Sequence, residues 1–214
     1  MRASKRIENL LAGGGDGWAL FFRARQMVAE GQPVTELTIG EHDIRTDPSI
    51  LAAMGRAAEA GHTGYSAIPG TDRLRDLVAR RVSERTGVPT NRENVLIVPG
   101  GQSGLFAAHH ATLDEGDTAL FIDPYYAPSP GTIRGVGARP LAVKALPEDG
   151  FQPRASAIAA VAAEAKTLLI NSPNNPTGAV YTRQTLEGIA EVAKANALWV
   201  ISDEVYDTQI WNGQ

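Results

Sequence analysis

Short apolar runs and helical patterns alternate along the second half of the chain. Runs of strand length occur at residues 94–98, 118–122, 139–143, 168–170 and 198–201. Between them, apolar residues recur at helical spacing over residues 105–113, 155–165 and 182–196. Such an alternation indicates parallel strands that are joined by crossover helices. We therefore predict an α/β fold with a mostly parallel sheet and helices on both faces.

The first part of the chain has more helical than strand character. Helical patterns begin at Asp16, at Pro48 and after Gly70. Residues 35–39 alternate between polar and apolar side chains, which predicts one short strand that ends at Gly40.

Composition narrows the functions open to the chain. Its 214 residues are 43% hydrophobic, which is enough for a substantial core, and the net charge of −4 comes with no basic stripe. We therefore expect no nucleic-acid partner. The absence of cysteine excludes disulfides and thiolate nucleophiles, and no histidine has a second ligand at metal spacing, so we expect no metal site. No apolar run reaches membrane-spanning length, and we expect a cytoplasmic protein with no membrane partner.

Two polar segments follow neighbouring strands of the predicted sheet. Residues 171–178 contain Asn175 in a turn stiffened by prolines, and residues 202–206 contain Asp203 and Tyr206. Parallel strands place both segments at the carboxyl edge of the sheet, where ligands of open α/β sheets bind. An amide, a carboxylate and a phenol at this edge are spaced to converge on one planar ligand.

A third segment, residues 99–104, is a turn of small residues that leads into a helix. Such a turn exposes unpaired backbone N–H groups at the positive end of the helix dipole, where a phosphate is held. Its glycines do not have the spacing of a dinucleotide-binding loop, a P-loop or a hydrolase nucleophile elbow. We therefore predict a phosphate site of another class at this turn.

Asn-Pro-Thr-Gly at residues 175–178, followed by Asp-x-x-Tyr at residues 203–206, resembles the core of the fold-type I pyridoxal phosphate enzymes. Within them it is most similar to the aspartate aminotransferase-like group, the class I and II aminotransferases. The resemblance implies that Asp203 pairs with the protonated pyridine nitrogen of pyridoxal 5'-phosphate, and that Asn175 and Tyr206 hydrogen-bond the phenolic oxygen of its ring. A carboxylate at the pyridine nitrogen keeps that nitrogen protonated, which deepens the electron sink of the ring.

The same resemblance implies which residues hold the phosphate and cover the ring. Gly101, Gln102 and Ser103 match the phosphate cup of the family, and Tyr126 matches the aromatic residue that stacks on the pyridine ring. Some aspartate aminotransferases carry a lysine at the position of Gln102, where it serves a dicarboxylate substrate. The glutamine in this chain therefore weakens an assignment to aspartate.

Two further matches lie earlier in the chain. Gly40 belongs to a Gly-x-x-Asp turn, and the resemblance implies that its backbone approaches the substrate carboxylate. Tyr65 precedes Gly70 and a Leu-Arg pair, and the corresponding tyrosine of the family touches the cofactor phosphate of the partner subunit. The resemblance thus implies a homodimer with a shared site.

The Schiff-base lysine of the family has no match in this chain. In the family it lies beyond the Asp-x-x-Tyr segment and commonly has a serine three residues before it. That serine is lacking at all four lysines, Lys5, Lys144, Lys166 and Lys194. We therefore expect no catalytic lysine and an inactive chain, which we interpret as the amino-terminal portion of a family member. Residues 1–45 would form an arm with part of the small domain, and residues 46–214 an incomplete large domain that binds pyridoxal phosphate.

The resemblance implies a pyridoxal phosphate-dependent aminotransferase of amino acid metabolism and biosynthesis. Its substrates would be an amino acid that gives up its amino group and a 2-oxo acid that receives it. A C–S or β-eliminating lyase, or a cyclopropane-carboxylate synthase, on the same scaffold is an alternative. A non-catalytic module that binds pyridoxal phosphate or dimerises is another, and the visible motifs do not separate these alternatives.

Overall fold

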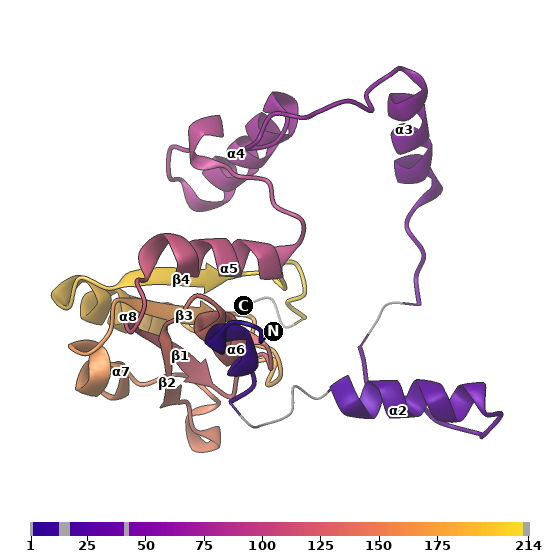
Figure 1. The fold of residues 1–214 in the computed structure, drawn as a ribbon. Coiled ribbons are helices and arrows are strands. Elements are labelled where there is room, and N and C mark those ends of the chain that lie inside the picture. Colours follow the sequence, from indigo (N-terminus) through magenta and orange to yellow (C-terminus); the bar gives the residue numbers. More distant parts are fainter. Residues whose placement is uncertain (1, 13–17, 41–42, 212–214) are drawn as a thin grey trace. The chain divides into compact units, whose positions relative to one another are not determined.

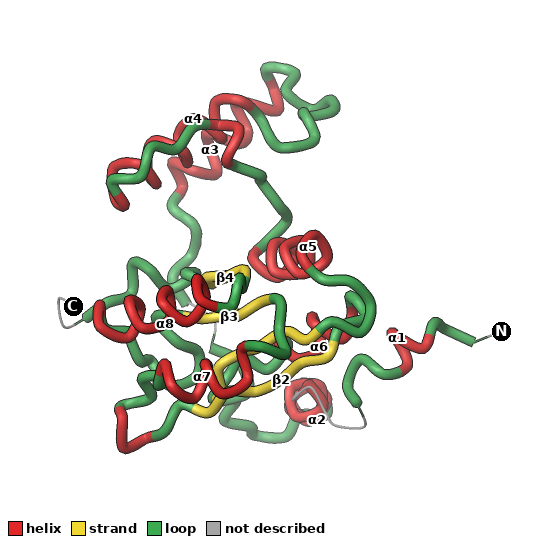
Figure 2. Tube along the Cα trace, turned by 90° about the vertical axis from the view of Figure 1, so that its left-hand side faces the viewer, coloured by secondary structure: helices red, strands yellow, loops and turns green. Residues whose placement is uncertain are grey.

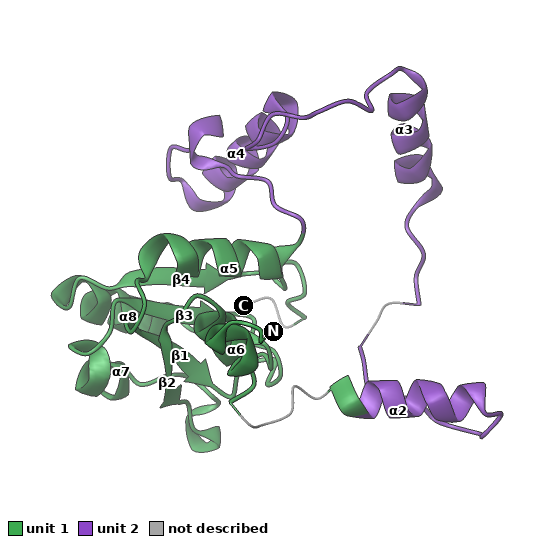
Figure 3. Cartoon of the chain, in the orientation of Figure 1, with its two compact units in different colours: residues 1–19, 100–214 green, residues 20–99 purple. Residues whose placement is uncertain are grey.

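The computed structural model describes residues 2–12, 18–40 and 43–211 (Figure 1). The chain forms two compact units, one of residues 1–19 and 100–214 and the other of residues 20–99 (Figure 3). The boundaries of these units, after residues 19 and 99, differ from the predicted domain boundary after residue 45, which stays a prediction.

The first unit contains a four-stranded sheet in which every neighbouring pair is parallel. Its strands, in the order β2-β1-β3-β4 across the sheet, are β2 (Arg139–Lys144), β1 (Thr118–Asp123), β3 (Thr167–Asn171) and β4 (Trp199–Asp203). The parallel α/β sheet predicted from the sequence is confirmed. After β1 the chain forms β2 on one side of it and then β3 on the other side, so the strand order reverses between β1 and β3. Ligands of such sheets bind outside the carboxyl ends of the strands at this point.

Helices cover both faces of the sheet (Figures 1 and 2). Successive strand residues point to opposite faces, so Ala119 and Phe121 join one core while Leu120 and Ile122 join the other. The first core includes residues of α5 (Gly101–Thr112) and α6 (Ser129–Gly135), and the second includes residues of α7 (Ala155–Ala162) and α8 (Arg183–Ala195). The layers predicted from the sequence are therefore confirmed.

The second unit is helical in the part that the structure describes. Its helices are α2 (Trp18–Ala29), which begins in the first unit, α3 (Pro48–Glu59) and α4 (Asp72–Thr86). The predicted start of the first helix at Asp16 lies outside the described residues. The remaining short elements of the chain are α1 (Lys5–Glu8), η1 (Arg92–Asn94) and η2 (Pro147–Asp149).

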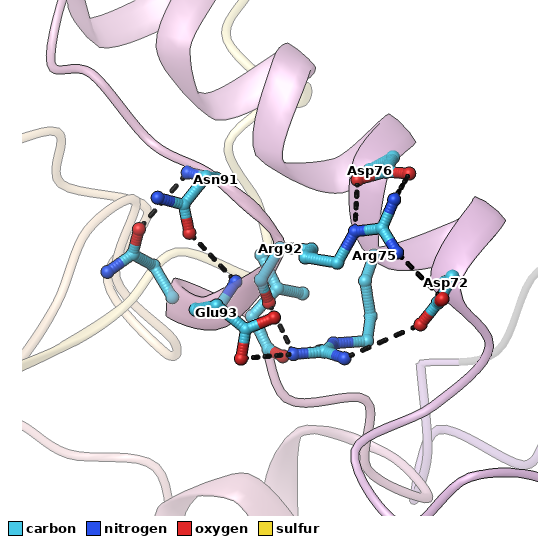
Figure 4. A network of polar contacts seen from close by, with 8 residues as sticks. Asp72, Arg75, Asp76, Asn91, Arg92 and Glu93 are labelled. Carbon is cyan, nitrogen blue, oxygen red and sulfur yellow. Dashed lines mark hydrogen bonds and ion pairs between the residues drawn. The ribbon is translucent and has the colours of Figure 1, made fainter.

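Two arginines join α4 to η1 (Figure 4). Arg75 is buried, and its guanidinium donates to the carbonyl oxygens of Val95 at 3.0 Å and Arg92 at 2.7 Å. Arg92 in turn binds Asp76 at 2.6 Å and Asp72 at 2.7 Å. This network fixes the backbone after η1, so it has a structural role in the unit.

Two strand predictions are wrong. Residues 94–98 were expected to be the first strand of the large sheet, but Asn94 ends η1 and residues 95–98 pair with no strand among the described residues. The Ile97 N–H donates instead to the carbonyl oxygen of Pro69 at 2.9 Å. Residues 35–39 likewise form no strand. An apolar or alternating run becomes a strand only where another strand pairs with it, and the run itself does not encode that partner.

Candidate functional site

A pocket of about 200 Å³ lies at the carboxyl edge of the sheet. It is lined by Gly101, Gln102, Leu105, Tyr126, Asn171, Asn175, Asp203, Val205 and Tyr206. The fold thus brings together six of the side chains or backbone positions that the sequence singled out, from the start of α5, the loop after β1 and the ends of β3 and β4. We call this pocket the edge pocket.

Asn171, the last residue of β3, connects the two polar segments of the edge pocket. Its Oδ1 accepts the backbone N–H of Asn175 at 2.8 Å, and its Nδ2 donates to the backbone oxygen of Asp203 at 3.0 Å. Asn171 and Asp203 are also register partners in the β3–β4 pair. Asn171 was not among the residues predicted for the site, although a polar residue at the end of a buried strand is a usable signal. Its two bonds fix the turn of Asn175 to the end of β4.

The turn that carries Asn175 is also rigid within itself. Asn174 is buried, and its Oδ1 accepts both the backbone N–H of Thr177 at 3.1 Å and the hydroxyl of Thr177 at 2.8 Å. Gly178 has a φ of 74°, a conformation that side chains other than glycine rarely adopt. These contacts hold Asn175 in one orientation at the edge pocket.

The amide of Asn175 and the phenol of Tyr206 meet at the edge pocket. The Asn175 Nδ2 donates to the Tyr206 hydroxyl at 3.3 Å, and both side chains are half-buried. An amide N–H₂ group has a second N–H, and a phenol has its own O–H, so the pair can donate to one further oxygen between them. The geometry suits an anionic or phenolic oxygen of a bound ligand.

Asp203 is the single acidic residue that lines the edge pocket. Its Oδ1 accepts the backbone N–H of Val205 at 3.1 Å, and no ion pair joins it to a cation of the described residues. A half-buried carboxylate without a cationic partner, beside neutral amide and phenol groups, suits a ligand that brings a positive charge.

The first turn of α5 supplies the anion-binding side of the edge pocket. Gly100 precedes this helix with a φ of 89°, and Gly101, Gln102 and Ser103 form its first turn, where the positive end of the helix dipole favours an anion. Gly101 and Gln102 line the pocket, whereas Ser103 does not. The Gln102 Nε2 donates to the hydroxyl of Thr132 on α6, so the side-chain amide of Gln102 is bonded to that helix.

The two tyrosines of the loop after β1, Tyr125 and Tyr126, have different surroundings. Tyr126 lines the edge pocket, as the sequence predicted. Tyr125 instead packs its ring edge-on against Phe121, with ring centroids 5.0 Å apart and an angle of 87° between the planes. Tyr126 is therefore the ring available to a ligand of this pocket.

Gly40 and Tyr65 belong to the other compact unit, where Tyr65 is fully exposed. Their predicted contacts are with a substrate and with a partner subunit, and both assignments stay predictions.

None of the four lysines lines the edge pocket. Lys144 ends β2, and Lys194 lies in the last turn of α8. Lys166 precedes β3 and binds Asp117 at 2.7 Å, and this hydrogen-bonded carboxylate raises the pKa of the Lys166 ammonium. Lys5 belongs to α1. The site as described therefore contains no amine that could bind a ligand covalently.

The described residues carry neither a metal-binding cluster nor a membrane-spanning helix. Histidine, aspartate and glutamate side chains nowhere gather in a group of three that could hold a metal ion. No described helix combines the length and the apolar character that a bilayer crossing requires.

Comparisons with known proteins agree on one family. Residues 32–214 match the family model of class I and II aminotransferases. The chain is 35% identical over 192 residues to a probable aspartate/prephenate aminotransferase of Thermus aquaticus, covering 89% of this chain and 50% of that protein. It is 32% identical over 215 residues to an arginine–pyruvate transaminase of Pseudomonas aeruginosa, covering 100% and 55%. An aspartate aminotransferase of Thermus thermophilus, solved with maleate, superposes with a TM-score of 0.93 at 32% identity, covering 100% of this chain and 56% of that one.

The chain spans about half the length of these relatives. The edge pocket fits the cofactor of their family, because an unpaired carboxylate, a pair of donors for one oxygen and a helix start for a phosphate lie around it. The chain belongs to the class I and II aminotransferases, whose cofactor is pyridoxal phosphate.

Proposed function

We propose that the protein of which this chain is a part is an aminotransferase that moves an amino group from an amino acid to a 2-oxo acid. The observation that carries the proposal is Asp203, a carboxylate without a cationic partner among the described residues, at a pocket that it shares with Asn175 and Tyr206. When bound, pyridoxal phosphate supplies a conjugated ring that accepts the electron pair left at the substrate Cα.

Asp203 would hold the proton on the pyridine nitrogen of the bound cofactor. Its carboxylate would stabilise the positive charge there, which favours catalysis because a protonated ring withdraws electrons more strongly. Asn171 positions Asp203 by its bond to the Asp203 backbone oxygen, at 3.0 Å. The rigid end of β4 therefore keeps the carboxylate ready before any ligand binds.

The other residues of the edge pocket bind and orient the ring. Asn175 and Tyr206 would donate to its phenolic oxygen, and the backbone N–H groups of Gly101, Gln102 and Ser103 would bind the phosphate. Tyr126 would cover one face of the ring and exclude water from it, which would contribute about 0.5–1.5 kcal/mol beyond the burial itself. These groups come from the start of α5, the loop after β1, the turn after β3 and the end of β4 with the turn that follows it, so contacts from four segments would orient the ring.

Further groups complete the site from outside this unit. In the proposed enzyme, the Gly40 backbone lies near the substrate carboxylate, and Tyr65 of one subunit reaches the cofactor phosphate held by the other. With Tyr65 shared in this way, the protein would be a homodimer. We also propose that it is cytoplasmic. The base that moves the Cα proton would be a lysine of the remaining length of the protein, a proposal supported by the edge pocket containing no lysine and by relatives that are about twice as long.

The test is amino transfer by the full-length protein. Asp203→Ala should lower kcat/KM at least about a hundredfold, because it removes a charged group that stabilises the transition state. Glu204→Ala is the matched control, since Glu204 is the adjacent exposed carboxylate and its Oε1 accepts the Ser202 hydroxyl at 2.8 Å. An Asp203→Ala protein within a few-fold of the parent would refute the assignment. Release of ammonia without amino transfer would favour the lyase alternative.

A further inference from the structure

A second cavity lies next to the edge pocket and shares Gln102 with it. Its volume is about 530 Å³, which is within the range of small-molecule sites. Its walls come from α1 and the start of α2, from α5, from the loop after β1 and from α6. We call this cavity the side-chain chamber. Because Gln102 lines both cavities, the side-chain chamber lies beside the cofactor site.

The side-chain chamber is mainly apolar and aromatic. Trp18, Phe106 and Tyr125 line it and remain 42%, 43% and 40% exposed. Leu10 and Pro128 are among the other lining residues. Large aromatic side chains that stay this exposed around a cavity favour an apolar ligand, because covering them removes apolar surface from water.

The polar groups of the chamber are largely engaged with the protein. The Gln102 amide donates to the Thr132 hydroxyl, and that hydroxyl donates to the Pro128 oxygen at 3.1 Å. Arg134 is the one charged residue in the lining, and its Nε donates to the Leu10 oxygen at 2.8 Å. Arg134 thereby holds the chain segment after α1 in place as a wall. Gln102, the residue shared by the chamber and the cofactor site, carries a neutral amide. A second carboxylate of a substrate would therefore lose its hydration beside Gln102 without gaining a cation there.

We propose that the side-chain chamber binds the side chain of the amino acid substrate and that the preferred substrates carry large apolar or aromatic side chains. The inference rests on the aminotransferase function proposed above. In a hydrophobic pocket, one methylene more or less on the substrate changes kcat/KM by about 10- to 200-fold. The kcat/KM for phenylalanine or leucine therefore exceeds that for aspartate by at least about tenfold.

The glycines of α6 offer a way to fill the chamber. A Cβ at Gly131 would meet the Leu10 oxygen at 3.7 Å, which is ordinary contact, whereas one at Gly135 would have closer neighbours, with Phe106 at 3.4 Å and Leu10 at 3.5 Å. Gly131→Leu therefore places a side chain at the chamber wall without a clash at its Cβ, and leucine also favours the helix more than glycine does. Gly55→Leu on α3 is the control, since Gly55 is exposed and has nothing within 4 Å of its Cβ position.

The experiment measures kcat/KM of the full-length protein for phenylalanine, leucine, alanine and aspartate. The proposal expects phenylalanine and leucine to exceed aspartate by at least about tenfold, and Gly131→Leu to lower the phenylalanine-to-alanine ratio by about tenfold while Gly55→Leu leaves the ratio of the parent. A preference for aspartate that Arg134→Gln abolishes would overturn it, because the chamber would then hold a second carboxylate.

Binding of substrate-like acids decides the question if Gly131→Leu does not fold. By calorimetry, 3-phenylpropanoate should bind the unmodified full-length protein at least about tenfold more tightly than maleate, and the reverse order would contradict the chamber's assignment. A protein that transfers no amino group from any of the four donors contradicts the proposed function instead. The same two acids still test the chamber in that case.

Discussion

Replacing Asn171 should weaken the binding of pyridoxal phosphate by more than the accompanying loss of folding stability explains. Asn171→Ala removes a 2.8 Å bond to the Asn175 N–H and a 3.0 Å bond to the Asp203 oxygen. At about 0.5–1.5 kcal/mol for each hydrogen bond, the free energy of unfolding should fall by about 1–3 kcal/mol. Asn171 is half-buried, so water can replace part of both bonds and the lower half of this range is expected.

The effect on the cofactor arises because both partners of Asn171 belong to the edge pocket. Without it, the turn of Asn175 and the end of β4 can move independently, so binding pyridoxal phosphate has to order both of them. A cost of about 1.4 kcal/mol would weaken binding tenfold.

The control for this comparison is Asn196→Ala. The Asn196 Nδ2 donates to the Val192 oxygen at 2.9 Å at the end of α8, and its side chain is half-buried as well. Urea unfolding measures the stability of both variants, and titration with pyridoxal phosphate measures their affinity. Asn196→Ala should lose stability but keep its affinity. Equal affinities for the two variants would refute the positioning role of Asn171.

Three other predictions follow from the described residues and the proposed function. Tyr126→Ala should weaken binding of pyridoxal phosphate about two- to tenfold in a titration and Tyr126→Phe should not, because stacking of about 0.5–1.5 kcal/mol needs only the ring. Burial lowers the pKa of His109 below its usual 6.5, so the unfolded chain takes up the proton first, and the unfolding free energy should fall as the pH drops below about 6.5. His109→Leu should remove that part of the pH dependence in urea unfolding at pH 7.5 and 5.5. Light scattering should find the full-length protein dimeric, and Tyr65→Phe should weaken its hold on the cofactor phosphate; a monomer with unchanged affinity would contradict this.

The layers of the fold and the main site residues could be predicted because their signals are local. Asp203 and Asn175 each follow an apolar run, and parallel strands that end at one edge bring such residues together whatever the details of packing. Residues 94–98 carry an equally apolar run, yet they form no strand, because a strand depends on a partner elsewhere in the chain.

The features that the sequence did not predict depend on contacts between distant segments. The bond of Asn171 to Asp203 joins residues 32 positions apart, and the bond of Arg134 to Leu10 joins residues 124 positions apart. Neither pair has a spacing or a periodicity that a local pattern could reveal. Arg134 and Leu10 both line the side-chain chamber, which therefore could not be predicted from a local pattern.

Titration of the purified 214-residue chain with pyridoxal phosphate tests the central claim most directly. The account predicts saturable, reversible binding that inorganic phosphate competes with, that Asp203→Ala weakens at least about tenfold, and that Glu204→Ala leaves unchanged. Binding that is equal in the parent and in Asp203→Ala would contradict the proposed site. So would a borohydride-stable adduct on one of its lysines together with amino transfer, because no lysine lines the edge pocket.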